Sequence, residues 1–378
     1  MTVPSRPFPV IRWHAPDSPE QWNTVIGDAL FLPSGRFALL QGLLRLGLKP
    51  GDAIAVPAYY CESGLQAIVA QGFEPVFFDI GDDLEIPCTS LEAALSNRKI
   101  KAVLLVHFFG FLSVSREPAI RLCRAAEVKI IEDYCHSFLT LPAKMNKEMA
   151  GDIFIFSMRK TLPVADGGAL VHRDCHWEGR GGCRPFALDF PFLTKRLVEA
   201  MVIRLGWPNP YGAAADSLKK VHARLFGKGV RTVKNDGGDG LLPPSWSLGH
   251  ILSDGSYLRH VAQTRRSNYC KLAEALAPMR LQIAIRALGE DDVPQILPVM
   301  DNSGSLLDFL RSKGIGAYRW PGKELPSEVM SRRDIFPNAN RINDSIVCLP
   351  VHQDIRDSHI TFIADAVAIW SKTIRVEQ

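Results

Sequence analysis

The sequence has few of the features that mark membrane-spanning, secreted or nucleic-acid-binding proteins. No apolar run reaches the roughly 18–20 residues that a membrane-spanning helix needs. The opening segment, MTVPSRPFPVIRW, lacks the apolar centre of a signal peptide. The formal net charge is only +4, and the basic residues are spread along the chain. We therefore expect a cytoplasmic protein that binds small molecules and has neither nucleic acid nor a membrane as partner.

Cysteine is present, but not in a pattern that binds metal. The eight cysteines include no Cys-x-x-Cys pair, a spacing that zinc sites and redox-active thiols commonly use. Scattered cysteines are usually free thiols in a reducing compartment. We expect no disulfide framework and no metal site. Cys348 lies in an apolar run, so we expect it to pack in the core.

Apolar segments that suit buried strands alternate with segments of helical periodicity. This alternation indicates an α/β fold with a large, mostly parallel, doubly wound sheet that is covered by helices on both faces. The hydrophobic content of 47% in 378 residues is enough for such a domain and a smaller one. The predicted strands are 53–57, 75–80, 102–107 and 129–132, and the predicted helices are 36–47, 62–72, 89–97 and 115–127.

The alternation stops at residues 175–245, which contain glycine-rich and Trp-Pro-Asn-Pro stretches, and we interpret them as an irregular insertion. The prediction is a large domain over residues 1–245. A long linking helix and a small C-terminal α/β domain follow over residues 246–378. The elements predicted there are helices at about 255–277, 306–313 and 357–373 and strands at about 293–299 and 346–349.

An acid and a lysine follow two neighbouring apolar runs between residues 130 and 170. The first run leads into Glu132 and Asp133, and the second leads into Ser157 and, three residues later, Lys160. A pyridoxal phosphate (PLP) enzyme needs such a pair, because a lysine forms the Schiff base and an acid keeps the pyridine nitrogen protonated. Taken alone, Lys160 would be interpreted as an ordinary surface lysine at a strand end, and a helix N-cap is a common alternative for Asp133.

Further motifs stand on both sides of this segment. They are Ser34-Gly35-Arg36 ahead of a helix, Lys49–Asp52, Val56–Tyr60, Glu74–Ile80, Val106–Gly110, Ile131–His136 and Leu349–His352. Each motif is weak alone, but their order and spacing resemble the DegT/DnrJ/EryC1/StrS family over roughly residues 30–175 and 245–370. Members of that family are fold type I PLP-dependent aminotransferases, and many act on nucleotide-linked keto sugars.

The resemblance implies roles around the cofactor ring. Lys160 would carry the cofactor as an internal aldimine and move the substrate proton, and Asp133, rather than Glu132, would contact the pyridine nitrogen. His136 would lie beside the ring near the phenolic oxygen, and Tyr60 would stack on the ring. Ordinary core packing is the alternative for His136 and Tyr60.

The phosphate group and the substrate have their own candidate residues. Backbone N–H groups at a helix N-terminus bind phosphate well, so Ser34 and Gly35 are candidates, although plain N-capping by Ser34 would use the same geometry. The remaining candidates are Arg36 and Ser157 for the phosphate, and His107, Arg319 and Trp320 for the substrate.

The resemblance implies a homodimer that transfers an amino group from an amino acid, glutamate by analogy, to the keto group of a nucleotide-linked sugar, as in polysaccharide biosynthesis. An aminotransferase for a non-sugar carbonyl and a non-catalytic PLP-binding regulatory protein stay open. Sugar dehydratases of the same scaffold have a histidine in place of the lysine, which Lys160 argues against. A nicotinamide dehydrogenase would show a Gly-x-Gly-x-x-Gly turn, which this sequence lacks.

Overall fold

The computed structural model describes most of the chain outside the predicted insertion. It covers residues 1–8, 29–96, 99–140, 150–164, 166–175, 245–322 and 324–377, together with isolated residues between 185 and 201. The insertion predicted at 175–245 therefore lies almost wholly outside the described residues. Within the described part, no helix has both the length and the apolar character needed to cross a membrane.

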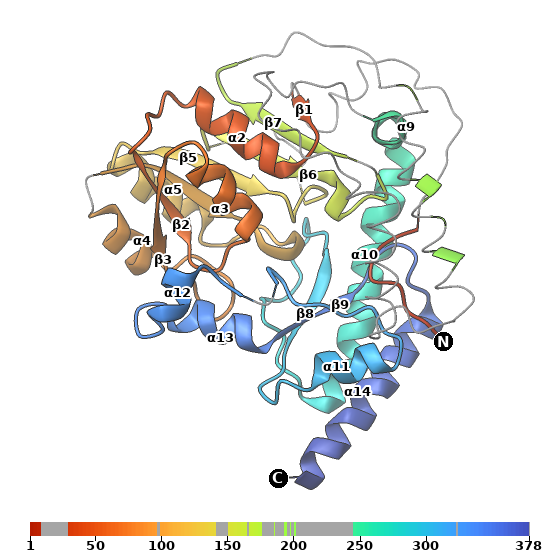
Figure 1. Ribbon diagram of the computed structural model, residues 1–378. Helices are drawn as coiled ribbons and strands as arrows, with labels where there is room; N and C mark the ends of the chain where they lie inside the picture. Colours follow the sequence, from red (N-terminus) through yellow and green to blue (C-terminus); the bar gives the residue numbers. More distant parts are fainter. Residues whose placement is uncertain are drawn as a thin grey trace, which may run out of the picture.

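A seven-stranded sheet forms the larger part of the described structure (Figure 1). Its strands are β1 (Leu30–Leu32), β2 (Ala53–Pro57), β3 (Glu74–Phe78), β4 (Ile100–Val106), β5 (Lys129–Tyr134), β6 (Ile153–Ser157) and β7 (Gly168–His172), in the order β1-β7-β6-β5-β4-β2-β3. Strands β3, β2, β4, β5 and β6 are parallel, whereas β7 and β1 pair antiparallel at one edge. The mostly parallel sheet predicted from the sequence is thus confirmed.

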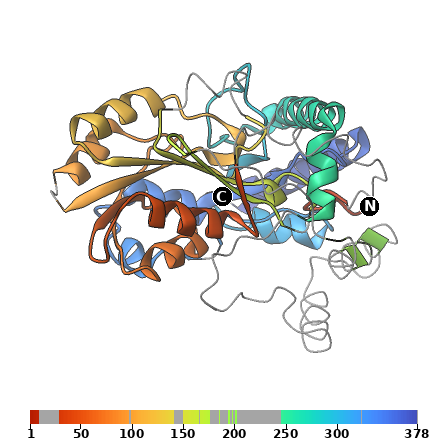
Figure 2. The ribbon, with the colours of Figure 1, turned by 90° about the horizontal axis from the view of Figure 1, so that it is seen from above.

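Helices cover both faces of this sheet. Figure 2 shows α2 (Gly35–Arg45) and α3 (Glu62–Val69) on one face and α4 (Cys88–Leu95) and α5 (Arg116–Ala125) on the other. Successive residues of a strand point to opposite faces. In β2, Ile54 and Val56 accordingly join the core cluster of α2 and α3, whereas Ala53 and Ala55 join the cluster of α4 and α5. The central strands are largely apolar because both of their faces are mostly buried.

The C-terminal part contains a two-stranded antiparallel sheet of β8 (Ile296–Met300) and β9 (Ile346–Pro350). Two long helices, α10 (Gly255–Leu276) and α14 (Asp357–Glu377), pack side by side along it (Figure 1). The division of the chain between residues 245 and 246 stays a prediction. The remaining helices are α9 (Trp246–Ser253), α11 (Leu306–Ser312), α12 (Ser327–Ser331) and α13 (Pro337–Ser345).

Two backbone hydrogen bonds join the C-terminal part to the large sheet. The N–H of Val293 donates to the carbonyl of Gly110 at 3.1 Å, and the N–H of Gln295 donates to that of Phe109 at 2.7 Å. A Cβ at Gly110 would lie 2.1 Å from the Val293 carbonyl oxygen, so only glycine fits there. Because residues 293–295 are engaged in this way, the strand predicted from residue 293 begins only at Ile296.

Candidate active site at the ends of the parallel strands

The carboxyl ends of the parallel strands meet at one edge of the sheet. Tyr60 follows β2, His107 follows β4, and Lys160 follows β6, while Asp133 lies near the end of β5. The strand order reverses between β2 and β4, since β3 lies beyond β2 and β5 lies beyond β4. In open α/β sheets, ligands bind outside the carboxyl ends of the strands at such a reversal.

The two adjacent acids of β5 point to opposite faces of the sheet. Glu132 faces α5, where Arg116 donates from Nε to Oε2 at 2.6 Å and from Nη2 to Oε1 at 3.0 Å. Its remaining partners are the N–H of Gly151 at 2.8 Å and the Tyr134 hydroxyl at 3.3 Å. Burial alone would raise the pKa of Glu132, but hydrogen bonds from His107 and Arg116 lower it to about 2.

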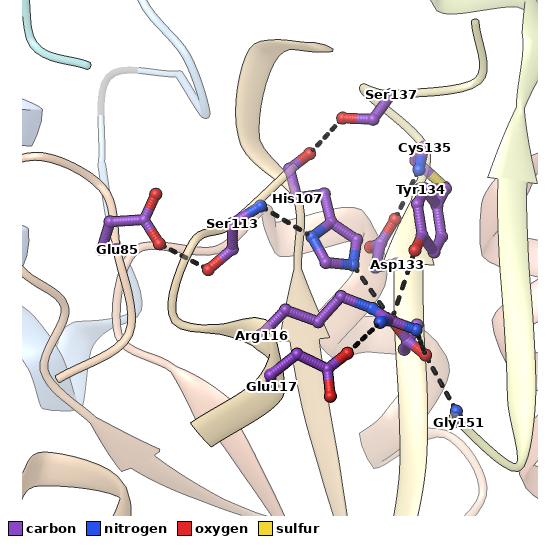
Figure 3. A network of polar contacts seen from close by, with 11 residues as sticks. Glu85, His107, Ser113, Arg116, Glu117, Asp133, Tyr134, Cys135, Ser137 and Gly151 are labelled. Carbon is purple, nitrogen blue, oxygen red and sulfur yellow. Dashed lines mark hydrogen bonds and ion pairs between the residues drawn. The ribbon is translucent and has the colours of Figure 1, made fainter. Parts of the chain in front are cut away.

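His107 belongs to the same network as Glu132. Its Nε2 lies 3.3 Å from Glu132 Oε2, and its Nδ1 accepts from the N–H of Ser113 at 3.3 Å (Figure 3). The imidazole is buried against the Tyr134 ring, with centroids 4.3 Å apart. The structure therefore places His107 with the acid that faces α5, and does not bring it to the face of the sheet where Asp133 lies.

Asp133 faces α2 and α3 and accepts hydrogen bonds from Tyr60 and Cys135. The Tyr60 hydroxyl donates to Oδ2 at 2.9 Å, and the N–H of Cys135 donates to Oδ1 at 2.8 Å. Both Asp133 and Tyr60 are buried. Burial, together with the nearby Asp133 charge, raises the pKa of the Tyr60 hydroxyl well above its ordinary value, so the hydroxyl remains a donor. A carboxylate accepts about four hydrogen bonds, so Asp133 has capacity for a further ligand.

His136 follows Asp133 by three residues, and one of its ring nitrogens has no partner among the described residues. Its ring stacks on Phe109 with centroids 5.3 Å apart and planes 6° apart, and its Nδ1 accepts from the N–H of Phe109 at 3.5 Å. Among the described residues, the buried Nε2 has no hydrogen-bond partner. Burial and, after it, the charge of Lys160 hold the pKa of His136 well below its usual range. The imidazole is therefore neutral and can offer Nε2 to a bound ligand.

The beginning of α2 packs against the ends of β5 and β6. A Cβ at Gly35 would lie 2.5 Å from Cys135 Sγ and 3.2 Å from Ser157 Cβ, so glycine permits this approach. Ser34 is the N-cap of α2, but its side chain makes no capping hydrogen bond. Its backbone rests on Gly168, where a Cβ would lie 2.2 Å from the Ser34 carbonyl oxygen. Ser34, Gly35 and Ser157, predicted from separate motifs, are thus neighbours in space.

Positive charge gathers around this helix end. Arg36 is the second residue of α2, and its guanidinium lies 5.6 Å from the Phe37 ring centroid. Desolvation, followed by the charges of Arg6 and Arg36, lowers the pKa of the Arg159 guanidinium. A helix N-terminus with several arginines nearby is suited to an anion such as phosphate. The sequence reasoning did not single out Arg6 and Arg159, although Arg159 directly precedes Lys160.

Lys160 is in a short 3-10 turn (Met158–Lys160) directly after β6, and its side chain is half-buried. Its charge acts on both Cys135 and His136, the residues that follow β5. The next residue, Thr161, offers its carbonyl to Nη2 of Arg265 at 2.8 Å. Arg265 was also missed from the sequence, because it lies in the middle of an amphipathic helix where a long cation is usually solvated.

Trp320 and Arg319 reach this region from the C-terminal part. The Trp320 ring meets the His136 ring edge-on with centroids 4.5 Å apart. The backbone carbonyl of Trp320 accepts a hydrogen bond from the Tyr59 hydroxyl. Phe108 and Phe109 also contact it, each at a centroid distance of 5.7 Å. Arg319 is half-buried, and its buried Nε has no hydrogen-bond partner among the described residues. The structure therefore brings Trp320 to the candidate site, with Arg319 next to it in the chain.

Comparisons with known proteins agree with this geometry. Residues 26–180 match the model of the DegT/DnrJ/EryC1/StrS aminotransferase family. MosB of Rhizobium meliloti is 33% identical over 151 residues, which are 39% of this chain and 29% of that protein. GDP-perosamine synthase of Escherichia coli O157:H7 is 28% identical over 163 residues, which are 40% of this chain and 44% of that protein. The matched regions thus span less than half of these curated relatives.

A solved structure extends the likeness to almost the whole chain. NtdA from Bacillus subtilis, which was crystallised with its bound cofactor PMP, has a TM-score of 0.64 and 18% identity, and the match covers 94% of this chain and 77% of that one. At this identity the likeness concerns the fold. The family resemblance drawn from the sequence motifs is confirmed over residues 26–180, which match the model of the DegT/DnrJ/EryC1/StrS aminotransferase family.

Proposed function

We propose that this protein is a PLP-dependent aminotransferase. One observation carries the proposal: a buried carboxylate, Asp133, and a lysine, Lys160, lie at the ends of neighbouring parallel strands on the face of the sheet where α2 begins. An acid, an amine and an anion-binding helix end are thus combined in one place. The family match of residues 26–180 and the cofactor of NtdA support the same cofactor here.

The side chains at the site fit the parts of PLP. Ser34, Gly35, Arg36 and Ser157 would hold the phosphate, since the glycine leaves the helix end open and the α2 dipole favours an anion. Asp133 would accept a hydrogen bond from the protonated ring nitrogen. The orphaned Nε2 of His136 would find its missing partner in the phenolic oxygen.

When bound, PLP supplies an aldehyde that condenses with amines and a protonated ring that accepts electrons from the substrate. Lys160 would hold the cofactor between turnovers and, once released, would take the proton from the substrate carbon and return it to the cofactor carbon. The charged Asp133 carboxylate would keep the ring nitrogen protonated throughout. The side chains of Trp320 and Phe109, which both contact His136, would exclude water from this region.

The proposed reaction moves an amino group from an amino acid, glutamate by family analogy, to the keto group of a nucleotide-linked sugar. GDP-perosamine synthase, a relative by sequence, supports a sugar nucleotide as acceptor. Arg319 would suit a carboxylate or phosphate of the substrate, because a guanidinium pairs with either. We also propose a homodimer with the active sites at the subunit interface. The cytoplasmic location stays a prediction.

The absorbance spectrum of the purified protein tests the cofactor. Protein incubated with PLP should show a near-visible band that borohydride fixes to the chain, and Lys160→Ala should abolish the fixation. Lys101→Ala, in the exposed position of β4, is the matched control and should keep it. A protein that binds no added PLP would refute the proposal.

The amino-group transfer needs a second measurement. Glutamate should bleach the band, and a nucleotide-linked keto sugar from a panel should restore it. Bleaching by glutamate without restoration by any keto sugar would favour a non-sugar carbonyl acceptor. A stable band that no amino acid bleaches would favour a PLP-binding protein without aminotransferase activity.

A further inference from the structure

Tyr60 and Asp133 form a buried pair that the family resemblance did not lead us to expect. The Tyr60 hydroxyl donates to Asp133 Oδ2 at 2.9 Å, and the two side chains are 3% and 4% exposed. The N–H of Cys135 holds the other oxygen, Oδ1, at 2.8 Å. Each carboxylate oxygen therefore has a fixed donor from the protein, and since a carboxylate accepts about four hydrogen bonds, Asp133 can accept a further one.

The Tyr60 side chain packs in a space that a glycine of α3 leaves open. Tyr60 lies between β2 and the N-cap of α3, and its ring packs against Gly64 in the first turn of that helix. A Cβ at Gly64 would lie 2.3 Å from Tyr60 Cε1 and 2.6 Å from its hydroxyl oxygen. A glycine in a helix costs about 0.5–1 kcal/mol relative to alanine. That cost is offset here because glycine leaves room for the phenol to reach Asp133.

No other described carboxylate competes for this hydroxyl. Glu132, the neighbouring acid, points to the opposite face and is engaged by Arg116, Gly151 and Tyr134. Burial and the Asp133 charge both keep the phenol protonated by raising the pKa of Tyr60. The phenol is therefore a permanent donor to Asp133 rather than a base.

We propose, resting on the aminotransferase function above, that Tyr60 is a positioning residue whose hydroxyl stabilises the charged form of Asp133 and so keeps the proton on the cofactor's ring nitrogen. In a buried site, the position of a proton shared between a carboxylate and a pyridine nitrogen depends on how well the surroundings stabilise the ion pair. Hydrogen bonds donated to the carboxylate favour the ion pair. The protonated ring is the stronger electron acceptor.

This role differs from the stacking predicted for Tyr60 from the sequence. Stacking needs the aromatic ring, which Tyr60→Phe preserves. The proposed role needs the oxygen, which Tyr60→Phe removes. Tyr60→Leu removes both. Tyr59→Phe is the matched control, because Tyr59 is the adjacent buried tyrosine and donates its hydroxyl to the Trp320 carbonyl instead of to a carboxylate.

The experiment measures the ring proton directly. Wild-type protein and each variant are loaded with PLP that carries ¹⁵N in the ring, and the nitrogen chemical shift is recorded by NMR. In Tyr60→Phe, the resonance should move from the pyridinium value toward that of neutral pyridine, while Tyr59→Phe keeps the wild-type value. Bleaching of the absorbance band by glutamate should slow about tenfold in Tyr60→Phe, as expected for one hydrogen bond to a charged group.

Two further arms separate the possible outcomes. Loading with 1-deaza-PLP, in which CH replaces the ring nitrogen, should remove the rate difference between wild type and Tyr60→Phe. Gly64→Ala, which pushes the intact phenol away from Asp133, should move the ring-nitrogen resonance in the same direction as Tyr60→Phe. A wild-type resonance and rate in Tyr60→Phe, with a loss only in Tyr60→Leu, would overturn the inference in favour of stacking. Failure of the wild type to bind PLP would refute the proposed function itself.

Discussion

Glu132→Gln tests quantitatively whether Glu132 is a charged structural residue, distinct from its neighbour Asp133. Glu132 is 0% exposed and receives two hydrogen bonds from Arg116, whose side chain is 9% exposed. The substitution keeps the size of the side chain but removes its charge. It therefore leaves the Arg116 guanidinium buried without its counterion, and it presents an amide donor where the guanidinium also donates.

The size of the effect can be worked out in two ways. Removing one partner of a buried ion pair costs about 3–5 kcal/mol. Independently, the pKa of Glu132 falls from an ordinary 4.5 to about 2 in the folded protein, and a pKa difference of one between the folded and unfolded states corresponds to about 1.4 kcal/mol. The second route gives about 3 kcal/mol at neutral pH. We expect Glu132→Gln to lower the free energy of unfolding by about 3 kcal/mol.

The pH dependence of this loss has a definite sign. Because the folded state depresses the pKa of Glu132, its contribution is fully present above the unfolded pKa and is lost as the pH falls toward 2. The difference in unfolding free energy between wild type and Glu132→Gln should therefore be constant from about pH 8 to pH 6 and shrink below about pH 5. Urea unfolding of the cofactor-free protein, followed by circular dichroism, measures it.

Glu117→Gln is the matched control. Glu117 pairs with the same arginine at 2.7 Å, but its side chain is 63% exposed. Exposed ion pairs contribute about 0–1 kcal/mol, so Glu117→Gln should be nearly neutral. Equal effects of the two substitutions, or a Glu132→Gln loss that does not shrink in acid, would refute the assignment of Glu132 to a buried, charged structural role.

Two further variants test other parts of the site. Gly35→Ala should weaken PLP binding at least about tenfold in a fluorescence titration, because its Cβ would lie 2.5 Å from Cys135 Sγ at the proposed phosphate position. Gly255→Ala is the control. Gly255 is likewise the first residue of a helix, α10, but the nearest atom to its Cβ would be 3.5 Å away, so this variant should bind PLP normally. Arg265→Met should slow the reaction of the active-site lysine with PLP about 10–100-fold by releasing the Thr161 carbonyl. Arg266→Met removes donors to the carbonyls of Gly289 and Asp292 instead, so this variant should react at the wild-type rate in stopped-flow absorbance measurements. Equal rates for both variants would contradict a positioning role for Arg265.

The sequence predicts most strands of the large sheet because they are short, largely apolar runs, whereas the three-residue β1 was missed. The strand predicted at 53–57 is β2 to the residue, and the helix predicted at 115–127 is close to α5. Burial on both faces leaves almost no alternative for such runs. In contrast, α13 was missed because its sequence, PNANRINDS, is mostly polar. Its first N–H groups are capped by Asp79 from the end of β3, a partner that no local pattern reveals.

The site shows the same division between local and distant information. Ser34, Gly35 and Ser157 were assigned to one phosphate group from separate motifs, and they are neighbours in the structure. Each of them lies at the end of a predicted element. The functions assigned to the individual residues stay predictions. Sequence alone did not give the partners of the acids, because the arginine that engages Glu132 and the tyrosine that engages Asp133 come from other elements of the fold. Strand alternation is what separates those two acids once the register is known.

The site at the strand ends is the central claim, and mapping the lysine that binds the cofactor tests it most directly. Protein loaded with PLP is reduced with borohydride, digested with a protease and analysed by mass spectrometry. We predict one major adduct, on the peptide that contains Lys160, and no such adduct in Lys160→Ala. A stable adduct on a different lysine, or none on the loaded wild-type protein, would contradict the account.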